Sequence, residues 1–389
     1  MRALFFAPAS RRLLLTTALV YLVLGALQAL YGPAFPWMGR RFGVDATGAG
    51  LTVSLHFAGA LVASLAAAPA LMRFGYRPVL PAGAASIVIG AGTIALAPAF
   101  AWVLTGALIG GLGFGLLSVA VNLRVARAFG DDAAPALNLL NALFGLGAVT
   151  GPLAVGLAGG SLVPAMIALV AAAGLSAVTT ARLPEPVRPG TGGTASVPFG
   201  LAGLFVAMYV LYVSTEIGVG SWETVHLAPR LGERDAAFHT SLYWAALTVG
   251  RVLVTPISAR LRPSTLVVWA SALGLVFLLA AQVPALALFA YPLVGLSLAP
   301  IFPTGIAWLQ RAFPRRSEAV ASLVLAFAGL GPIVTSGAIG ALVASFGTQW
   351  VPTALATIAA ALLAVVLLLR RATVHLPPLA SERERTGGR

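Results

Sequence analysis

The feature that most constrains this chain is a succession of apolar runs, each close to the length that a helix needs to cross a bilayer. In lipid, only helices and closed barrels satisfy all of their backbone polar groups internally. Because these runs are continuous rather than alternating, they indicate helices. The composition agrees, since 59% of the residues are hydrophobic and 9% are charged, whereas soluble domains carry about 25% charged residues.

The runs predict an all-α membrane protein with twelve transmembrane helices in two pseudo-symmetric six-helix bundles. The N-terminal bundle is expected within residues 1–180, with spans at 13–37, 47–70, 78–97, 102–126, 136–159 and 162–180. The C-terminal bundle is expected within residues 199–371, with spans at 199–225, 237–259, 265–283, 286–309, 319–346 and 350–369. Residues 181–198 are rich in Pro, Gly and Thr and are expected to form a flexible linker. Residues 372–389 are expected to form a tail.

The first apolar run begins after residues 1–12, which resemble the start of a signal peptide. No small-residue cleavage site follows the run, so we expect a first transmembrane helix instead. The chain has no cysteine, which excludes disulfides and thiolate chemistry.

Arginine supplies all 24 basic residues of the chain, whose formal net charge is +13. Nineteen arginines fall on one side of the predicted membrane and four on the other, while Arg251 lies within a span. The positive-inside rule therefore predicts that the linker and both termini are cytoplasmic. Because the arginines sit at the ends of apolar runs, nucleic acid is not expected as a partner. Arginine without lysine, together with abundant Ala and Gly, is typical of a GC-rich bacterial genome, so we expect a bacterial inner-membrane protein.

Two short basic turns repeat between the halves. Residues 73–78 (RFGYRP) follow the second span, and residues 260–263 (RLRP) follow the eighth. Twelve spans as six plus six with this repeated turn resemble the major facilitator superfamily. That resemblance implies a substrate site near the bilayer midplane, between two pseudo-symmetric bundles. The acid that the superfamily carries in the first turn, which helps to latch the bundles together, is replaced here by Met72.

Charged residues inside the membrane are candidates for function, because a charge at the bilayer centre costs about 2.5–3.5 kcal/mol or more. Glu216 lies deep in the seventh span. Burial disfavours the charged form of a carboxyl, which suits a proton-coupling group, although a structural hydrogen bond or an ion pair with Arg251 is the alternative. Arg251 is expected either to pair with Glu216 or to extend towards the basic turn at 260–263, and its depth favours the second. Glu223 is expected near the outer surface, in contact with water.

Amides form the candidate substrate site. Asn138 and Asn141 are three residues apart and share a helix face, and Asn122 lies in the fourth span. Amides both donate and accept hydrogen bonds, which suits the hydroxyls of a sugar, although hydrogen bonding between helices is an equally open reading. Gln28, Tyr31 and Trp222 complete the candidate set.

A closer resemblance lies in three segments. Residues 138–148 (NLLNALFGLGA), 212–222 (YVSTEIGVGSW) and 299–304 (APIFPT) are similar to motifs of the fucose permease branch of sugar:proton symporters. The resemblance implies that Asn141 contacts a sugar and that Asn122 is the asparagine ending the fourth-span motif. Where that branch has a proton-binding carboxylate in the fourth span, this chain has Ser118, which leaves Glu216 as the coupling candidate.

The expected function is therefore secondary transport of a small solute, most simply a neutral sugar or polyol coupled to protons. A proton-antiporting efflux pump for amphipathic compounds is the alternative, favoured if Phe, Leu and Val line the cavity. A membrane receptor without transport is a third reading, which the absence of soluble domains disfavours. No phosphate-binding loop, metal-ligand cluster or catalytic triad is apparent, so neither an enzyme nor a cofactor is expected. We expect a monomer in the bilayer.

Overall fold

The computed structural model describes residues 8–130, 133–185, 199–258, 260–314 and 316–374. Helices dominate it, and their bounds in the first half are α2 Pro8–Leu30, η1 Gly32–Ala34, α3 Phe35–Phe42, α4 Ala46–Phe74, α5 Tyr76–Ala95, α6 Phe100–Phe129, α7 Ala133–Leu157 and α8 Val163–Ala181. In the second half they are α9 Phe199–Leu231, α10 Glu233–Leu253, α11 Thr255–Ser258, α12 Pro263–Ala280, α13 Pro284–Leu298, α14 Ile301–Ala312, α15 Ser317–Ala328, α16 Leu330–Phe346, η3 Thr348–Trp350 and α17 Val351–Ala372.

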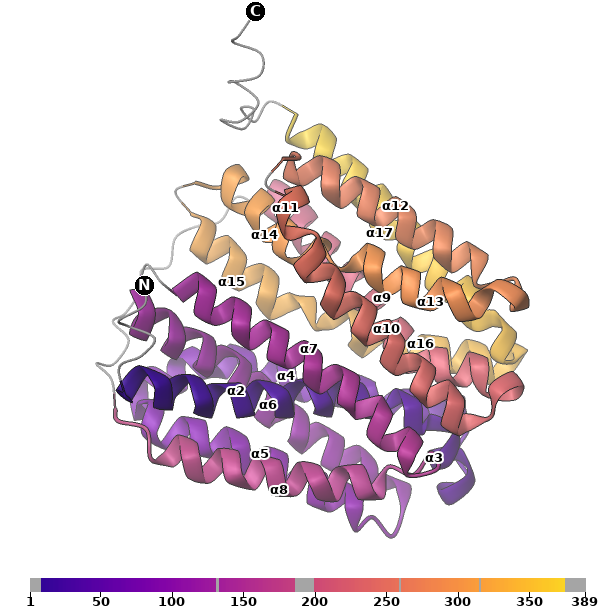
Figure 1. Cartoon of the computed structure of the whole chain (residues 1–389), viewed down its shortest axis with the longest axis horizontal. Helices are drawn as coiled ribbons and strands as arrows, with labels where there is room; N and C mark the ends of the chain where they lie inside the picture. The colour runs from indigo at the N-terminus through magenta and orange to yellow at the C-terminus, as the bar shows by residue number, and fades with distance from the viewer. Residues whose placement is uncertain (1–7, 131–132, 186–198, 259, 315, 375–389) are drawn as a thin grey trace, which may run out of the picture.

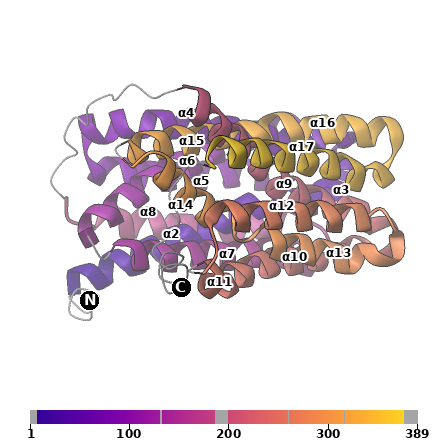
Figure 2. The same ribbon diagram turned by 90° about the horizontal axis from the view of Figure 1, so that it is seen from above.

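These helices form two bundles, α2–α8 and α9–α17, whose long helices run in broadly the same direction (Figures 1 and 2). The all-α membrane fold expected from the apolar runs is thereby confirmed. The predicted linker lies between α8 and α9, and its residues 186–198 fall outside the described residues, as do residues 375–389 of the predicted tail.

Eleven helical segments of the described chain are long and apolar enough to cross a membrane, one fewer than expected. The exception is the predicted eighth span, α10, which begins with Glu233, Arg234 and Asp235 and also carries His239 and Arg251. Nevertheless, α10 packs against α7, α9 and α13. It takes the position of a span in the bundle, because polar side chains of this helix pair with neighbouring helices.

Four predicted spans are divided into shorter helices: the first into α2, η1 and α3, the eighth into α10 and α11, and the tenth and eleventh into two helices each. The tenth span divides into α13 and α14 at Ala299 and Pro300, and the eleventh divides into α15 and α16 at Gly329. Proline explains the break in the tenth span, because Pro300 has no backbone N–H to continue the helical hydrogen bonds. Several helices also extend beyond the predicted span. For example, α9 continues six residues beyond residue 225, to Leu231.

The bundles touch at one end, which we call the closed end; it holds η1, α3 and the start of α10. There, a Cβ on Gly50 of α4 would lie 2.6 Å from the backbone oxygen of Ser336 on α16. Arg40 of α3 forms an ion pair with Glu233 of α10. The opposite end, which holds the start of α2 and the ends of α8 and α17, we call the terminus end. Figure 1 shows the bundles farther apart there.

Glycines that approach a neighbouring backbone hold both bundles together, and hydrogen bonds between helices add to them in the C-terminal bundle. In the N-terminal bundle, glycines of α6 meet the backbones of α4 and α5: a Cβ on Gly90 would lie 2.5 Å from the backbone nitrogen of Gly110. In the C-terminal bundle, Gly295 of α13 meets the backbone of Tyr243 on α10, and hydroxyl hydrogen bonds such as that between Thr224 and Thr240 join α9 to α10. Small residues that let helices approach are a typical means of association in membranes, where burying apolar surface gives little driving force.

Candidate functional site

Glu216 on α9 and Arg251 on α10 form a buried ion pair. Nη2 of Arg251 lies 3.0 Å from Oε1 of Glu216, and the two side chains are 10% and 23% exposed, for Glu216 and Arg251 respectively. The favoured expectation that Arg251 extends towards residues 260–263 is therefore wrong. The helix geometry explains why: Arg251 follows Trp244 by seven residues, so both lie on the same face of α10, and Trp244 packs against Gly220 of α9.

Further contacts fix the position of α9 at this pair. The Tyr243 hydroxyl donates a hydrogen bond to the backbone oxygen of Glu216 at 2.9 Å. The ring of Tyr212, one turn before Glu216, packs on Phe302 with centroids 6.3 Å apart. Breaking a buried ion pair by removing one partner typically costs about 3–5 kcal/mol. The pair is thus a strong local constraint, and changing its charge would alter the packing of α9 against α10.

Asn138 and Asn141 lie on the face of α7 that points towards the other bundle. They precede Gly145 by seven and four residues, spacings that share one helix face. A Cβ on Gly145 would lie 2.6 Å from Cγ2 of Thr248 on α10, so that face meets the C-terminal bundle. Both asparagines are exposed. The bundles have therefore separated one to two turns beyond Gly145, and the amides are accessible from the terminus end.

The register between α7 and α10 places the amides level with the ion pair. A Cβ on Gly156 of α7 would lie 2.6 Å from Cε1 of Phe238 on α10, and a Cβ on Gly145 would contact Thr248. Residue numbers rise along α7 as they fall along α10, so the two helices are antiparallel. One further turn towards the terminus end brings Asn141 to the level of Arg251.

Asn122 and Gln28 lie on α6 and α2 respectively, two helices of the N-terminal bundle that pack against α7. Asn122 is exposed, and its Nδ2 donates to the backbone oxygen of Ser118, one turn earlier on α6, at 2.7 Å. That bond leaves its carbonyl oxygen as an acceptor. Gln28 is half-buried and precedes Gly32, which contacts Ser221 of α9, by one turn. Both residues therefore remain candidates for the same site.

Tyr31 and Trp222 lie elsewhere. Tyr31 is fully buried, with its hydroxyl 3.4 Å from Nδ1 of His56 inside the N-terminal bundle. Trp222 is fully buried at the closed end, where its ring packs on Phe35 with centroids 5.0 Å apart. The structure does not bring either side chain to the exposed amides, because Tyr31 contacts His56 of its own bundle and Trp222 contacts Phe35 at the closed end.

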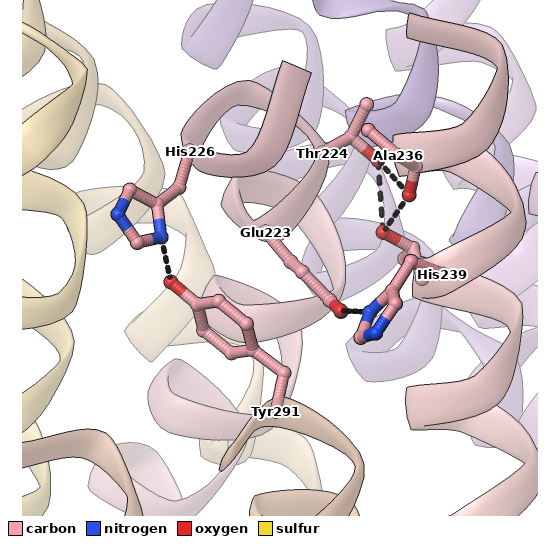
Figure 3. Close-up of polar contacts among 7 residues, drawn as sticks. Glu223, Thr224, His226, Ala236, His239 and Tyr291 are labelled. Carbon is pink, nitrogen blue, oxygen red and sulfur yellow. Dashed lines mark hydrogen bonds and ion pairs between the residues drawn. The ribbon is translucent and has the colours of Figure 1, made fainter. Parts of the chain in front are cut away.

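The expectation that Glu223 is a solvated surface carboxylate is wrong, because its side chain is completely buried. Its Oε1 lies 2.7 Å from Nδ1 of His239 on α10, as Figure 3 shows. In the same layer, His226 pairs with the Tyr291 hydroxyl at 2.7 Å. The apolar run that ends at residue 225 placed Glu223 too near the surface. Its spacing of seven residues from Glu216, which puts both on one face of α9, was the signal that could have found it.

The two buried pairs differ in chemistry. Arginine keeps its proton under all ordinary conditions, whereas histidine exchanges it. The pair of Glu216 and Arg251 is neutral only while the carboxyl is ionised. Protonation of Glu216 would therefore give the pair a net positive charge. The pair of Glu223 and His239 is neutral in two proton arrangements. Among the described residues, no cluster of three or more His, Asp or Glu side chains is arranged to hold a metal ion.

Two helical bundles that meet at one end, with eleven described segments long and apolar enough to cross a membrane, define a multi-pass membrane protein built from two halves. The model of the Major Facilitator Superfamily matches residues 17–213 and again residues 191–387. The chain therefore belongs to that superfamily of membrane transporters, and each half matches separately, which confirms the expected resemblance.

Individual relatives and solved structures are more distant. The glucose/mannose transporter GlcP of Bacillus subtilis (strain 168) is 28% identical over 141 residues, which cover 36% of this chain and 35% of that protein. The chain thus aligns with about a third of that relative's length. The D-xylose-proton symporter has a TM-score of 0.76 at 15% identity, covering 95% of this chain and 98% of that one. The nucleoside transporter NupG has a TM-score of 0.75 at 12% identity, covering 93% and 99%. At these identities the structures show a shared fold.

Proposed function

We propose that the chain carries a small neutral solute rich in hydroxyls, such as a sugar or polyol, by alternating access coupled to protons. The observation that carries the proposal is the buried pair of Glu216 and Arg251, level with the accessible Asn141 on the facing bundle. Asn122, Asn138 and Gln28 add donors and acceptors for hydroxyl groups. The similarity to a glucose/mannose transporter supports a sugar.

Coupling follows from the charge balance of the pair. When a proton binds Glu216, Arg251 loses its counter-charge while only 23% of its side chain is exposed. An uncompensated buried charge is costly, so protonation favours a rearrangement of α9 against α10 that brings Arg251 to water or to the solute. Release of the proton restores the pair. A proton shifts the equilibrium between two conformations only if it binds one of them more tightly than the other, and this rearrangement supplies such a difference.

The orientation is part of the proposal. The arginine distribution assigns the terminus end to the cytoplasm by the positive-inside rule. The conformation described here is then shut on the outside and accessible from the inside. We place the protein, as a monomer with both termini cytoplasmic, in a bacterial inner membrane.

The test is proton and solute flux in proteoliposomes. A thermal-shift screen with D-glucose, D-mannose, D-xylose and uridine first identifies a solute that stabilises the protein, because ligands that bind the folded state raise its stability. Glu216→Gln should then abolish proton-driven accumulation of that solute while preserving its exchange. The matched control is Asp235→Asn, which changes an exposed acid on α10 and should leave flux unchanged. Proton-driven accumulation that persists in Glu216→Gln would refute the coupling role.

A second candidate function, efflux of amphipathic compounds, rests on aromatic rings. Phe57, Phe114 and Phe144 form a chain of contacts between α4, α6 and α7, with successive centroids 6.4 Å apart. Phe114 and Phe144 are half-buried and lie on the helices that carry the asparagines. Thermal stabilisation by lipophilic cations but by none of the sugars would favour efflux over sugar transport.

A further inference from the structure

A cavity of about 390 Å³ lies at the terminus end of the C-terminal bundle. Four arginines line it: Arg260 and Arg262 from the turn between α11 and α12, Arg311 from α14, and Arg370 from α17. None of the residues that line it in the described chain is acidic. Four guanidinium groups from three separate elements give the cavity a positive electrostatic potential, which favours an anion.

The remaining walls also suit an anion. Ser264 and Thr265 line the cavity from the first turn of α12, an 18-residue helix. Helix N-termini present backbone N–H groups and a partial positive charge to anions, and hydroxyls add donors. The wall formed by Trp308 is fixed, because Nε1 of that ring donates to Oγ1 of Thr373 at 3.1 Å.

In the N-terminal bundle, a carboxylate of the chain itself occupies the place that corresponds to this cavity. The sequence Arg-Ala-Phe ends α6 at residues 127–129 and recurs at residues 311–313 at the end of α14, which marks the two regions as repeats. In the first half, the carboxylate of Glu185 sits at the start of α5 and accepts hydrogen bonds from the backbone N–H groups of Tyr76 and Arg77, both at 2.7 Å. Glu185 follows the end of α8. The residue that follows α17 at the same spacing, Leu376, lies outside the described residues.

We propose that this cavity binds the phosphate group of a ligand, either an anionic phospholipid headgroup or a soluble phosphate compound. Planar guanidinium groups bind phosphate in a bidentate manner. The cavity volume falls in the range of about 300–1,000 Å³ that is typical of small-molecule sites. Leu261 and Val374 line it and are 38% and 78% exposed, so a hydrocarbon chain attached to the phosphate can lie against them. Arg262 and Arg311 also interact within the chain, and the ligand would add to those interactions.

The test uses the purified full-length protein and three probes: dioleoyl-phosphatidylglycerol, dioleoyl-phosphatidylcholine and inorganic phosphate. Binding is measured by native mass spectrometry and by thermal shift. Phosphatidylglycerol should bind more tightly than phosphatidylcholine, whose headgroup is zwitterionic. Arg370→Gln should weaken that binding about tenfold, the effect of losing one charge-assisted hydrogen bond. Arg371→Gln is the matched control, because it removes the same charge from the next residue of α17, outside the cavity lining.

Each outcome has a defined meaning. Weakened phosphatidylglycerol binding in Arg370→Gln but not in Arg371→Gln supports the site. If inorganic phosphate binds with the same dependence on Arg370, the site is supported and its ligand is a soluble phosphate compound. Equal effects of the two substitutions would overturn the proposal, because they would indicate a general surface charge. Binding that occurs only after removal of residues 375–389 would also overturn it, since the chain's own tail would then be the occupant. None of these results depends on whether the protein transports a sugar.

Discussion

Gly340 of α16 offers a way to shift the conformation of this protein without disturbing its fold. A Cβ at Gly340 would lie 2.5 Å from the backbone oxygen of Ala46 on α4, with Thr47 Cα at 2.9 Å, whereas ordinary contacts lie at 3.4–4 Å. Both neighbours are backbone of the other bundle and cannot move aside as a side chain would. Gly340→Ala therefore penalises only the conformation in which the closed end is shut.

The size of the shift follows from the overlap. Overpacking typically costs about 1–3 kcal/mol, which corresponds to a change of about 5- to 150-fold in the ratio of the two conformations. The matched control is Gly337→Ala on the same helix, where the nearest atom, Oγ of Ser54, is 3.6 Å away. Both substitutions gain the same helix propensity of about 1 kcal/mol, so that contribution cancels.

The assay is the distance between spin labels at the terminus end. Met72→Cys on α4 and Leu325→Cys on α15 provide exposed sites in the two bundles, and the chain has no native cysteine to remove. Gly340→Ala should move the distance distribution towards shorter values, with Gly337→Ala indistinguishable from the parent. If both variants give the parent distribution, the contact at Gly340 does not hold the closed end shut and the reasoning is wrong.

Three further substitutions test the site and the fold. Asn141→Ala should raise the KM for the transported solute about fivefold, the loss of about 1 kcal/mol expected for one hydrogen bond, with no change in melting temperature; a folding defect would instead identify a helix-joining amide. Glu223→Gln should lower the stability by about 1–3 kcal/mol, because the completely buried side chain at this position loses its carboxyl–imidazole pairing with His239, and a chemical-denaturation midpoint equal to that of the parent would contradict this. Glu185→Ala should cost about 1 kcal/mol by removing the anion at the start of α5, which Glu185→Gln should partly restore in a thermal melt.

The sequence predicts well what depends on composition and spacing along a single helix. Apolar runs predict the helices, and the three-residue spacing of Asn138 and Asn141 places both amides on one exposed face of α7, as observed. The repeated basic turns indicate the superfamily, which the family match confirms. These features are local, so no knowledge of the neighbouring helices is needed to infer them.

What the sequence does not predict is which neighbour each face meets. The depth of Arg251 in its span favours a side chain that extends towards the basic turn at 260–263, yet the face of α10 that carries it meets α9, and the side chain pairs with Glu216. Glu223 lies at the end of an apolar run, yet α9 continues beyond it and α10 covers it with His239. Both errors arise because hydropathy indicates only how favourable a residue is in lipid. A polar side chain between two helices forms its hydrogen bonds with a partner side chain and so needs no contact with water.

The position of the buried carboxyls implies that acid and added volume act on different parts of this fold. Within the described ranges of the chain, the two buried carboxyls, Glu216 and Glu223, both lie on α9. Glycines that meet the backbone of a neighbouring helix occur in both bundles, as at Gly90 and Gly295. Acidification should therefore destabilise the contacts between α9 and α10 first, whereas an oversized side chain at a contact glycine should destabilise whichever bundle holds it. The segment that unfolds first would then differ between the two perturbations.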